Sequence, residues 1–328
     1  MEYRQLGNSD IHASVITFGA WAIGGAFWGG ADDDKAIEAI HASIDLGITS
    51  IDTAPMYGCG KSEQLVGKAV AGIRDKVHIF TKFGMNWTMT EGEFFFDLRE
   101  GDKSTQVYRN AKKDGIIYEC EVSLKKLRTD YIDLYQCHWR DHTTPVEETM
   151  EALEQLIQQG KIRAAGVCNF NVDEIETARQ SGPLTSVQPP YSMVRRDIEK
   201  DVLPYCREHN IGVVVYSPMQ RGLLTGKFRP DHQFASGDSR ANERYFKPEN
   251  VRRVNAFLDQ LRPIASDYNA TVGQIVLNWT IRQPGITAAL VGARDAVQAR
   301  ENAAAVNFTL SDSDFLQINH LLEKLELE

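Results

Sequence analysis

The stretch TSIDTAPMYGCGKSEQLVGKAVA, residues 49–71, decides the fold of this chain. Its first part, TSIDTA at 49–54, is short and apolar without clean alternation, which is typical of a strand buried on both faces. Its second part, KSEQLVGKAVA at 61–71, has the apolar spacing of an amphipathic helix. A buried strand followed by a helix is one unit of a parallel sheet with right-handed crossovers. The stretch therefore predicts an α/β protein.

The same alternation of strand and helix continues along the rest of the chain. Eight strands are predicted, at 15–20, 49–54, 76–82, 131–139, 162–170, 184–190, 211–218 and 285–292. Helices are predicted at 33–47, 61–71, 115–129, 145–160, 173–180, 199–210, 251–268, 271–283 and 296–305. Eight such units favour a closed (β/α)8 TIM barrel.

The alternative fold is an open doubly wound sheet, which usually carries a GxGxxG turn after its first strand. Here the first strand is followed by AWAIGGAFWGG, residues 20–30, where Trp and Phe interrupt the glycines and no helix begins on them. We therefore favour the barrel.

Four segments fall outside the repeating units. Residues 1–14 contain the turn signal GNSD and predict a small hairpin that caps the bottom of the barrel. Residues 311–328 predict a C-terminal amphipathic helix with Ser or Asp as its N-cap. The connections at 84–107 and 217–250 are long enough to be functional lids or binding elements. Within the first, GEFFFDLREGDK at 92–103 could be a flap or an oligomer contact, but we prefer an apolar loop tip packed back on the barrel.

Length and composition are those of a soluble globular protein. The chain has 328 residues, above the usual range of about 100–200 for one domain but suitable for one α/β barrel. Hydrophobic residues make up 42% and charged residues 25%. We therefore expect residues 1–328 to form a single barrel domain. The net charge of −9 argues against a nucleic-acid partner, because such proteins present a basic face.

Cysteine usage and targeting signals suggest the compartment. The five cysteines include no CxxC pair, so neither a disulfide framework nor a metal site is predicted, and a reducing cytoplasm fits best. The N-terminal MEYRQLGNSD lacks a signal-peptide core, and no run approaches the roughly 18 apolar residues of a membrane helix. We expect a cytoplasmic protein with no membrane partner, as a monomer or a weak homo-oligomer.

Polar side chains stand at the ends of otherwise apolar strands. Active sites of barrels lie at the C-terminal ends of the strands. Reading those ends gives Asp52, Lys82, His138, Asn169, Gln188 and Tyr216. Burial alone does not require this set, so we expect the active site there.

Tyr57, in the loop after Asp52, indicates the chemistry. A phenol has an ordinary pKa near 10. A nearby Lys82 ammonium favours the phenolate and makes the phenol more acidic, and Asp52 would keep that lysine charged. His138 could hydrogen-bond the oxygen of a substrate carbonyl. Such a group can protonate an oxygen while hydride reaches the neighbouring carbon, and it needs no metal.

Each of these residues also has a plainer explanation. Asp52 and Lys82 could form only a buried ion pair between adjacent strands. Tyr57 could pack within its loop, and His138 could be a strand-end histidine with satisfied hydrogen bonds. A chance placement of all four at successive strand ends is far less expected than a shared catalytic role.

Seven motifs resemble those of the aldo-keto reductase family, in order over residues 3–310: DTAPMYG, TKFG, DLYQCHW, GVCNF, QPPY, YSPMQRGLLTGK and GARDAVQAREN. The segment after the seventh strand and QPPY are most similar to the bacterial general-stress type reductases. The family consists of (α/β)8 barrels that reduce aldehydes and ketones with NADPH. The resemblance implies a small-molecule carbonyl substrate, such as a sugar or small aldehyde, and four catalytic residues with a tyrosine as general acid: Tyr57, Asp52, Lys82 and His138.

The resemblance also implies which residues bind the cofactor NADP(H), with Asp52 in this set as well. Asn169 and Gln188 would hydrogen-bond the nicotinamide carboxamide, because each amide offers a donor and an acceptor. Tyr216 would stack on the ring. Residues flanking the nicotinamide would be Gly19, Ala20 and Trp21, with Cys168 and Gly292 at neighbouring strand ends. Residues lining the pyrophosphate would be Ser217, Pro218, Met219, Gln220, Arg221 and Lys227.

The end of the eighth strand carries Arg294, followed at +4, +7 and +8 by Gln298, Glu301 and Asn302 on one helix face. The family uses this pattern for the 2′-phosphate and the adenine, and a guanidinium can bind a phosphate in bidentate fashion. NADPH is therefore expected in preference to NADH. Taken alone, Arg294 would be an ordinary surface arginine at the start of a solvated helix.

Three residues depart from the family pattern or add to it. Cys168 stands where the family usually has Ser, and a thiol is a weaker hydrogen-bond partner. Arg140 stands where related members often have Pro, which could alter the mouth of the pocket. Cys59, beside the catalytic loop, could be a redox-sensitive thiol, but a small filler residue is the preferred explanation.

The substrate pocket is assigned to tryptophans near the predicted loop tops, which suit an apolar or ring-stacking substrate: Trp21, Trp28, Trp87 and Trp139. Two other functions stay open on the same fold. One is a nucleotide-binding regulatory subunit with little turnover, against which the intact catalytic set argues. The other is a different barrel enzyme, such as a lyase or isomerase, against which the Arg294 pattern argues.

Overall fold

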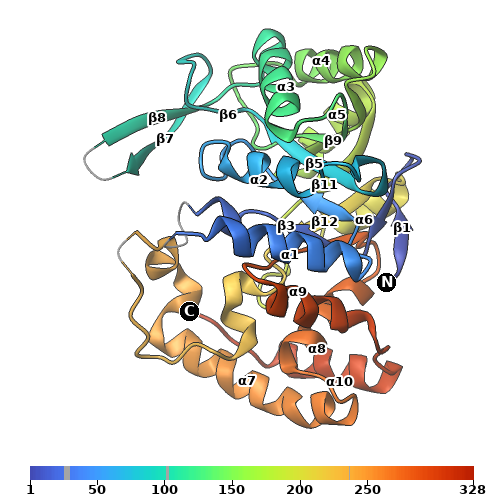
Figure 1. The fold of residues 1–328 in the computed structure, drawn as a ribbon. Helices are drawn as coiled ribbons and strands as arrows, with labels where there is room; N and C mark the ends of the chain where they lie inside the picture. The colour runs from blue at the N-terminus through green and yellow to red at the C-terminus, as the bar shows by residue number, and fades with distance from the viewer. Residues whose placement is uncertain (26–29, 101–102, 236) are drawn as a thin grey trace.

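Eight parallel strands close into a barrel in the computed structural model, which describes residues 1–25, 30–100, 103–235 and 237–328 (Figure 1). The predicted TIM barrel is therefore confirmed. Each strand pairs with the next along the chain and the last pairs with the first. The strands are β3 (Ile16–Gly19), β4 (Ser50–Asp52), β5 (His78–Phe83), β9 (Ile132–Cys137), β10 (Ile162–Cys168), β11 (Leu184–Gln188), β12 (Gly212–Tyr216) and β13 (Ala288–Gly292).

Helices surround the barrel and largely match the predicted ranges: α1 (Asp33–Asp45), α2 (Lys61–Ala69), α3 (Lys113–Leu127), α4 (Val146–Gln158), α5 (Val172–Ser181), α6 (Val202–Glu208), α7 (Pro248–Asp267), α8 (Val272–Arg282), α9 (Ala296–Ala303) and α10 (Asp312–Glu323). Capping explains several starts. The Asn171 side chain accepts from the backbone N–H of Glu174 and forms a capping box with it. Ser311 caps α10, as the sequence predicts.

The barrel interior is filled from below by the N-terminal hairpin. Strands β1 (Tyr3–Gln5) and β2 (His12–Ser14) pair antiparallel, which confirms the predicted cap. Leu6 and Ile11, from the turn between them, are fully buried in a cluster with strand residues Phe80, Leu134, Ala164, Val214, Ala288 and Leu290. The guanidinium of Arg4 donates to the carbonyls of Ile281 and Ile286 at 2.6 and 2.8 Å. The bottom of the barrel is therefore a sealed, structural end.

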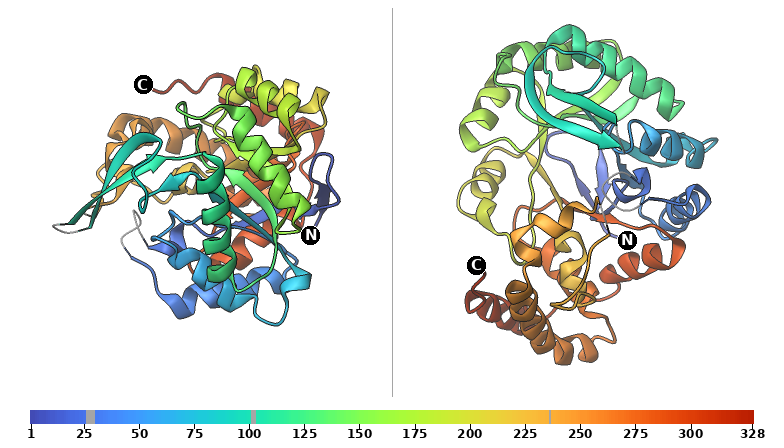
Figure 2. Two further views of the ribbon diagram at one scale, coloured as in Figure 1. Left: turned by 90° about the horizontal axis from the view of Figure 1, so that it is seen from above. Right: turned by 90° about the vertical axis from the view of Figure 1, so that its left-hand side faces the viewer.

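The connection after β5 is not a loop, as the sequence analysis expected, but a strand pair that extends from the barrel. Strands β6 (Met85–Asn86), β7 (Glu93–Glu100) and β8 (Lys103–Arg109) form a three-stranded antiparallel sheet in the order β6-β8-β7. Figures 1 and 2 show β7 and β8 projecting as an arm away from the helices. Residues 101–102 at its end lie outside the described residues. Leu98 and Val107 of the arm are buried in a cluster with Met56 and Met85 beside the barrel mouth.

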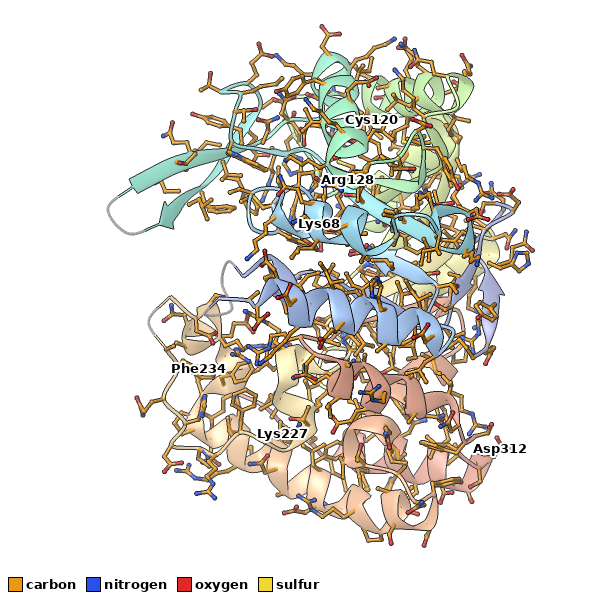
Figure 3. The ribbon with its side chains drawn as sticks, viewed as in Figure 1. Lys68, Cys120, Arg128, Lys227, Phe234 and Asp312 are labelled. Atoms are coloured by element: carbon orange, nitrogen blue, oxygen red, sulfur yellow. The ribbon has the colours of Figure 1, made fainter. Side chains whose placement is uncertain are left out.

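The segment between β12 and α7, described at residues 217–235 and 237–247, contains short 3-10 helices and lies on the same side of the molecule as the arm. Arg221 forms an ion pair with Glu243 across it and donates to Ser239 Oγ at 2.7 Å. Within the segment, the aromatic rings of Phe228, Phe234 and Phe246 pack against one another. Figure 3 labels Lys227 and Phe234 in this segment. It is thus an ordered flank of the barrel mouth.

Candidate active site

A polar layer lies directly above the apolar interior of the barrel. Side chains alternate along a strand, so a residue two positions beyond an interior residue points the same way. Lys82 follows Phe80 in this manner, and Gln136 follows Leu134. The register pairs Lys82 with Gln136 across neighbouring strands. Strand pleat and register therefore bring the predicted strand-end residues to one place.

Lys82 and Asp52 form a fully buried ion pair at the centre of this layer. Lys82 Nζ lies 2.6 Å from Asp52 Oδ1, and it also donates to the carbonyl of Thr53 at 2.9 Å. The same ammonium donates to the hydroxyl of Tyr57 at 3.3 Å. Asp52 is 1% and Lys82 0% exposed, so solvent screens the pair little. The structure brings three of the four predicted catalytic residues into direct contact.

The ionisation of Tyr57 reflects two opposing influences. Burial raises its pKa, and the Lys82 ammonium lowers it; the net result lies above the ordinary value of a phenol. For Lys82, burial lowers the pKa, but the neighbouring Asp52 and Tyr57 raise it by more, so it too lies above its ordinary value. The expected acidifying influence of the lysine is present but does not prevail here. Near neutrality the site holds a protonated phenol beside a charged ammonium.

His138 lies across the ring of Tyr57, with ring centroids 5.9 Å apart and an interplanar angle of 82°. Its backbone N–H donates to the carbonyl of Phe83, which places it just past the end of β9. Burial lowers the pKa of His138 well below its ordinary value, and the charge of Lys82 lowers it further. The imidazole is therefore neutral and can donate a hydrogen bond without adding a second charge.

The predicted amide residues lie next to this cluster. Gln188 Nε2 donates to Asp52 Oδ2 at 2.8 Å. Asn169 Nδ2 donates to the carbonyl of His138 at 3.0 Å, and Tyr216 donates its hydroxyl hydrogen to Asn169 Oδ1 at 2.9 Å. Hydrogen bonds thus connect the amides to the catalytic set.

Several non-glycine residues of the mouth adopt a left-handed backbone. Asn169, Ser217, Gln220 and Arg221 have φ of 61°, 57°, 44° and 54°. Each such conformation costs of the order of 1–3 kcal/mol and tends to be retained at functional sites. The concentration of these residues in two mouth loops supports a functional role for them.

A cavity of about 550 Å³ opens at the mouth and collects most of the predicted residues. Those lining it are Gly19, Trp21, Asp52, Tyr57, His138, Trp139, Asn169, Gln188, Tyr216, Ser217, Pro218, Met219, Arg221, Lys227, Gly292, Arg294, Gln298, Glu301 and Asn302. An adjoining cavity of about 460 Å³ shares Met219, Thr225, Lys227, Glu301 and Asn302 with it. Together they form one elongated cleft from the catalytic residues to the start of α9.

Besides the buried Lys82, four predicted site residues within the described ranges do not line the cavity. Ala20 is fully buried, and Cys168 places its Sγ 3.9 Å from Gln136 Oε1. Gln220 accepts a hydrogen bond from Ser192 Oγ at 2.9 Å. Trp87 packs with the base of the arm, with Lys126 over its ring, rather than on the cavity. Trp28, also assigned to the substrate pocket, lies outside the described residues.

Several residues that line the cavity were not identified by the sequence analysis. Phe96 reaches it from the arm, Met56 from the turn before Tyr57, Met85 from β6, and Arg240 from the segment after β12. Gln136 lies beneath its floor, buried against Asp52 and Gln188. A polar residue two positions past an interior leucine was a signal that could have identified Gln136. The arm residues left no comparable signal, because strands β7 and β8 were not predicted.

An ammonium buried beside the hydroxyl of a cavity-lining tyrosine forms a polar site at the mouth of a (β/α)8 barrel, the end at which barrel enzymes carry their active sites. Sequence comparison then assigns the family. The chain belongs to the aldo-keto reductases, since the model of the "Aldo/keto reductase family" matches residues 15–323. The chain is therefore an oxidoreductase of the family that reduces carbonyl compounds with a nicotinamide cofactor. The family resemblance stated from sequence is confirmed.

Relatives span nearly the whole chain. Aldo-keto reductase YhdN of Bacillus subtilis strain 168 is 40% identical over 326 residues, covering 98% of this chain and 94% of that protein. An NADH-specific methylglyoxal reductase of Escherichia coli strain K12 is 39% identical, covering 98% of each.

Solved structures agree with this assignment. A glycerol dehydrogenase from Gluconobacter oxydans superposes with a TM-score of 0.88 at 37% identity, covering 99% of this chain and 96% of the other. An aldo-keto reductase from Klebsiella pneumoniae in complex with NADPH gives 0.74 at 28% identity, covering 98% and 95%. Across the described ranges, no helix is both long and apolar enough to cross a membrane.

Proposed function

We propose that this chain reduces aldehydes or ketones to alcohols with NADPH, and that Tyr57 gives the proton. One observation carries the proposal: Lys82 Nζ lies 2.6 Å from Asp52 and 3.3 Å from the Tyr57 hydroxyl, beside a cavity that Tyr57 lines. A buried ion pair alone would not need a phenol on its cavity side. The arrangement supports proton donation to an oxygen held in that cavity.

The residues present fit a nicotinamide dinucleotide. The cleft is long, and its catalytic end offers the amides of Asn169 and Gln188 and the ring of Tyr216. Its far end offers Lys227 and Arg294, both exposed, and neither has a carboxylate within ion-pair distance among the described residues. Unpaired cations suit phosphates, and amides suit a carboxamide. The bound cofactor would supply hydride to the carbonyl carbon.

The protein's own contribution is to orient the carbonyl and to hold the proton. His138, kept neutral, would donate a hydrogen bond to the carbonyl oxygen. Tyr57 would donate its hydroxyl proton to the same oxygen as negative charge develops there. The Lys82 ammonium would stabilise the resulting phenolate, and Asp52 would keep that ammonium charged.

We also propose a preference for NADPH over NADH, as the sequence pattern at Arg294 predicts. Arg294 stands at the cleft where α9 begins, and the side chain of Gln298 accepts from its backbone N–H at 3.1 Å. The related Escherichia coli protein is described as NADH-specific, so the preference has to be measured for this chain. In the same proposal the chain acts as a single domain in the cytoplasm, as a monomer or weak homo-oligomer.

Tyr57→Phe tests the proposed function. The variant keeps the ring and loses the proton, so we expect at least a thousandfold loss of NADPH oxidation with a panel of aldehydes, ketones and sugars, and NADPH affinity within about twofold of the wild type. Tyr118→Phe, an exposed tyrosine of α3, is the matched control. Normal turnover by Tyr57→Phe would remove Tyr57 from the acid role. Tight NADPH binding without turnover of any substrate by the wild type would instead support the regulatory subunit.

A further inference from the structure

Gln136 is a residue of the polar layer to which the proposed mechanism gives no task. It lies on β9 between Asp52 and Gln188 and is fully buried. Unlike Asp52 and Gln188, it does not line the cavity. Its amide nonetheless contacts both the residue that keeps Lys82 charged and the residue proposed to bind the nicotinamide carboxamide.

The hydrogen bonds among these three side chains have only one consistent polarity. Gln188 Nε2 donates to Asp52 Oδ2 at 2.8 Å and to Gln136 Oε1 at 3.2 Å. Gln136 Nε2 donates to Asp52 Oδ2 at 3.4 Å. Turning the Gln188 amide over would place its oxygen against two other oxygens. The carboxylate and the Gln136 carbonyl therefore fix which end of Gln188 points inward.

This polarity determines what Gln188 offers to the cavity. A primary amide has two N–H donors, and both are used by Asp52 and Gln136. Its oxygen Oε1 has no donor among the described residues, and Gln188 lines the cavity. The free acceptor therefore remains for a ligand. The NH2 group of a carboxamide could donate a hydrogen bond to this oxygen.

One acceptor alone would hold Gln188 loosely. The terminal torsion of a glutamine is broad, so a single bond to Asp52 would leave the amide plane free to turn. The second bond, to Gln136, removes that freedom. Cys168 contributes to the same arrangement from the other side, with its Sγ 3.9 Å from Gln136 Oε1 and its side chain away from the cavity.

We propose that Gln136 is a positioning residue, which orients the Gln188 amide so that its oxygen faces the nicotinamide carboxamide. The inference rests on the proposed cofactor site. It adds a residue of β9 that acts on cofactor binding through Gln188, at a position where the cofactor itself does not reach.

A double-mutant cycle tests it by isothermal titration calorimetry, with NADPH and adenosine 2′,5′-bisphosphate as the probes. The second probe lacks the nicotinamide. Gln136→Met should weaken NADPH binding about three- to tenfold and leave adenosine 2′,5′-bisphosphate within about twofold. Gln188→Met should weaken NADPH at least as much. In the Gln188→Met background, Gln136→Met should add nothing further.

Two more variants separate orientation from simple damage. Gln136→Glu keeps an acceptor oxygen for Gln188, and its carboxyl, which burial beside Asp52 keeps protonated, can still donate to Asp52, so it should retain more NADPH affinity than Gln136→Met. Thr81→Val removes a buried hydroxyl from the neighbouring strand β5, which donates to Glu63 on the helix side, and should leave the affinity ratio of the two probes unchanged. If Gln136→Met does not fold, Gln136→Glu provides the test. A loss of NADPH affinity, relative to adenosine 2′,5′-bisphosphate, as large as that of Gln188→Met would overturn the proposal.

The outcomes distinguish the two proposals. An unchanged ratio in Gln136→Met, or losses that add in the double variant, would overturn the role of Gln136 while leaving the cofactor site intact. An unchanged ratio in Gln188→Met would instead reject the assignment of Gln188 to the carboxamide, and the inference with it.

Discussion

Tyr57 and His138 at the barrel mouth owe their pKa shifts to burial first and to the charge of Lys82 second. Burial raises the pKa of Tyr57 and lowers that of His138, and the ammonium of Lys82 lowers both. The same two influences therefore leave the phenol protonated and the imidazole neutral. A site of this kind can donate a proton while carrying a single positive charge, which Asp52 balances.

Arg294 provides a prediction at the phosphate end of the cleft. Arg294→Ala should weaken NADPH binding by about tenfold or more, because a charge-assisted bond to the 2′-phosphate is lost, and should leave NADH binding nearly unchanged. The measurement is the ratio of the two dissociation constants. Arg300→Ala, an exposed arginine of the same helix, is the control. A ratio that stays constant in Arg294→Ala would reject the phosphate assignment.

Glu119 provides a prediction about pH. Its carboxylate, buried on α3, accepts from the backbone N–H of Gly84 at 3.3 Å and from Asn86 Nδ2 at 3.2 Å. Burial raises the pKa of Glu119 to about 7 from an ordinary 4.5, although these hydrogen bonds lower it in part. The folded protein thus keeps a proton that the unfolded chain has lost. Stability from this group is complete below about pH 4.5 and is lost as the pH rises to about 7.

Glu119→Gln should remove this pH dependence. The neutral amide has no ionisation cost. The unfolding free energy of the variant minus that of the wild type should therefore increase by up to about 3 kcal/mol between pH 5 and pH 8. Urea unfolding at pH 5, 6, 7 and 8 measures it. Glu121→Gln, two residues along the same helix and exposed, should behave like the wild type. Parallel curves for Glu119→Gln and wild type would contradict the shift.

The candidate site was predictable from sequence where a polar residue ends an apolar strand. Asp52, Lys82 and Gln188 are found in this way because each is a polar residue at or near the end of a predicted apolar strand. Gln136 was missed because His138, two positions further on, already served as the polar end of that strand. Cys168 was placed at the cavity by resemblance, but the structure turns its thiol toward Gln136. Such side-chain directions depend on contacts between strands that are remote in sequence.

At the scale of elements, the arm of β7 and β8 departs most from expectation. The run FFF at 94–96 hides the alternation that would have indicated a strand. A β-bulge lies between Phe94 and Phe96, which pair with the consecutive residues Tyr108 and Val107. A bulge inserts one residue and changes which side chains share a face. Phe94 is consequently 50% exposed, whereas Phe96 lines the cavity.

The arm should therefore influence substrates and not the cofactor. Phe96→Ala should raise the KM for an aromatic aldehyde about five- to tenfold, because apolar contact is lost from the cavity wall, and should leave the NADPH dissociation constant unchanged. Steady-state kinetics with benzaldehyde and with a small aliphatic aldehyde measure the effect. Phe94→Ala, on the outer face, is the matched control. Equal behaviour of the two variants would show that the arm does not shape the substrate site.

At the scale of the whole molecule, stability and function lie at opposite ends of the barrel. The bottom is sealed by Leu6 and Ile11, and the mouth carries the cleft. The alternation of strands and helices predicted this barrel and its N-terminal cap because both follow from local patterns. The structures of the arm and of the segment at 217–250 were not predicted, because they depend on contacts with the finished barrel.

Leu6→Ala should separate the two ends. Removal of a fully buried side chain should lower the unfolding free energy by about 2–5 kcal/mol. The dissociation constant for NADPH, measured at a temperature where the variant stays folded, should remain that of the wild type. Leu316→Ala, at a position 66% exposed on α10, should cost less than about 0.5 kcal/mol. A loss of cofactor affinity in Leu6→Ala would mean that the two ends are coupled.

The cap formed by residues 1–14 has a consequence for biosynthesis. These residues leave the ribosome before the barrel strands, yet the place where Leu6 is buried exists only after the last strand, β13, has been synthesised and has paired with β3. Arg4 likewise finds its carbonyl partners some 277 and 282 positions downstream. A nascent chain must therefore carry this apolar segment without its native partners until almost the whole barrel has been translated. Ribosome-bound intermediates should accordingly depend on chaperones until the final turn of the barrel emerges.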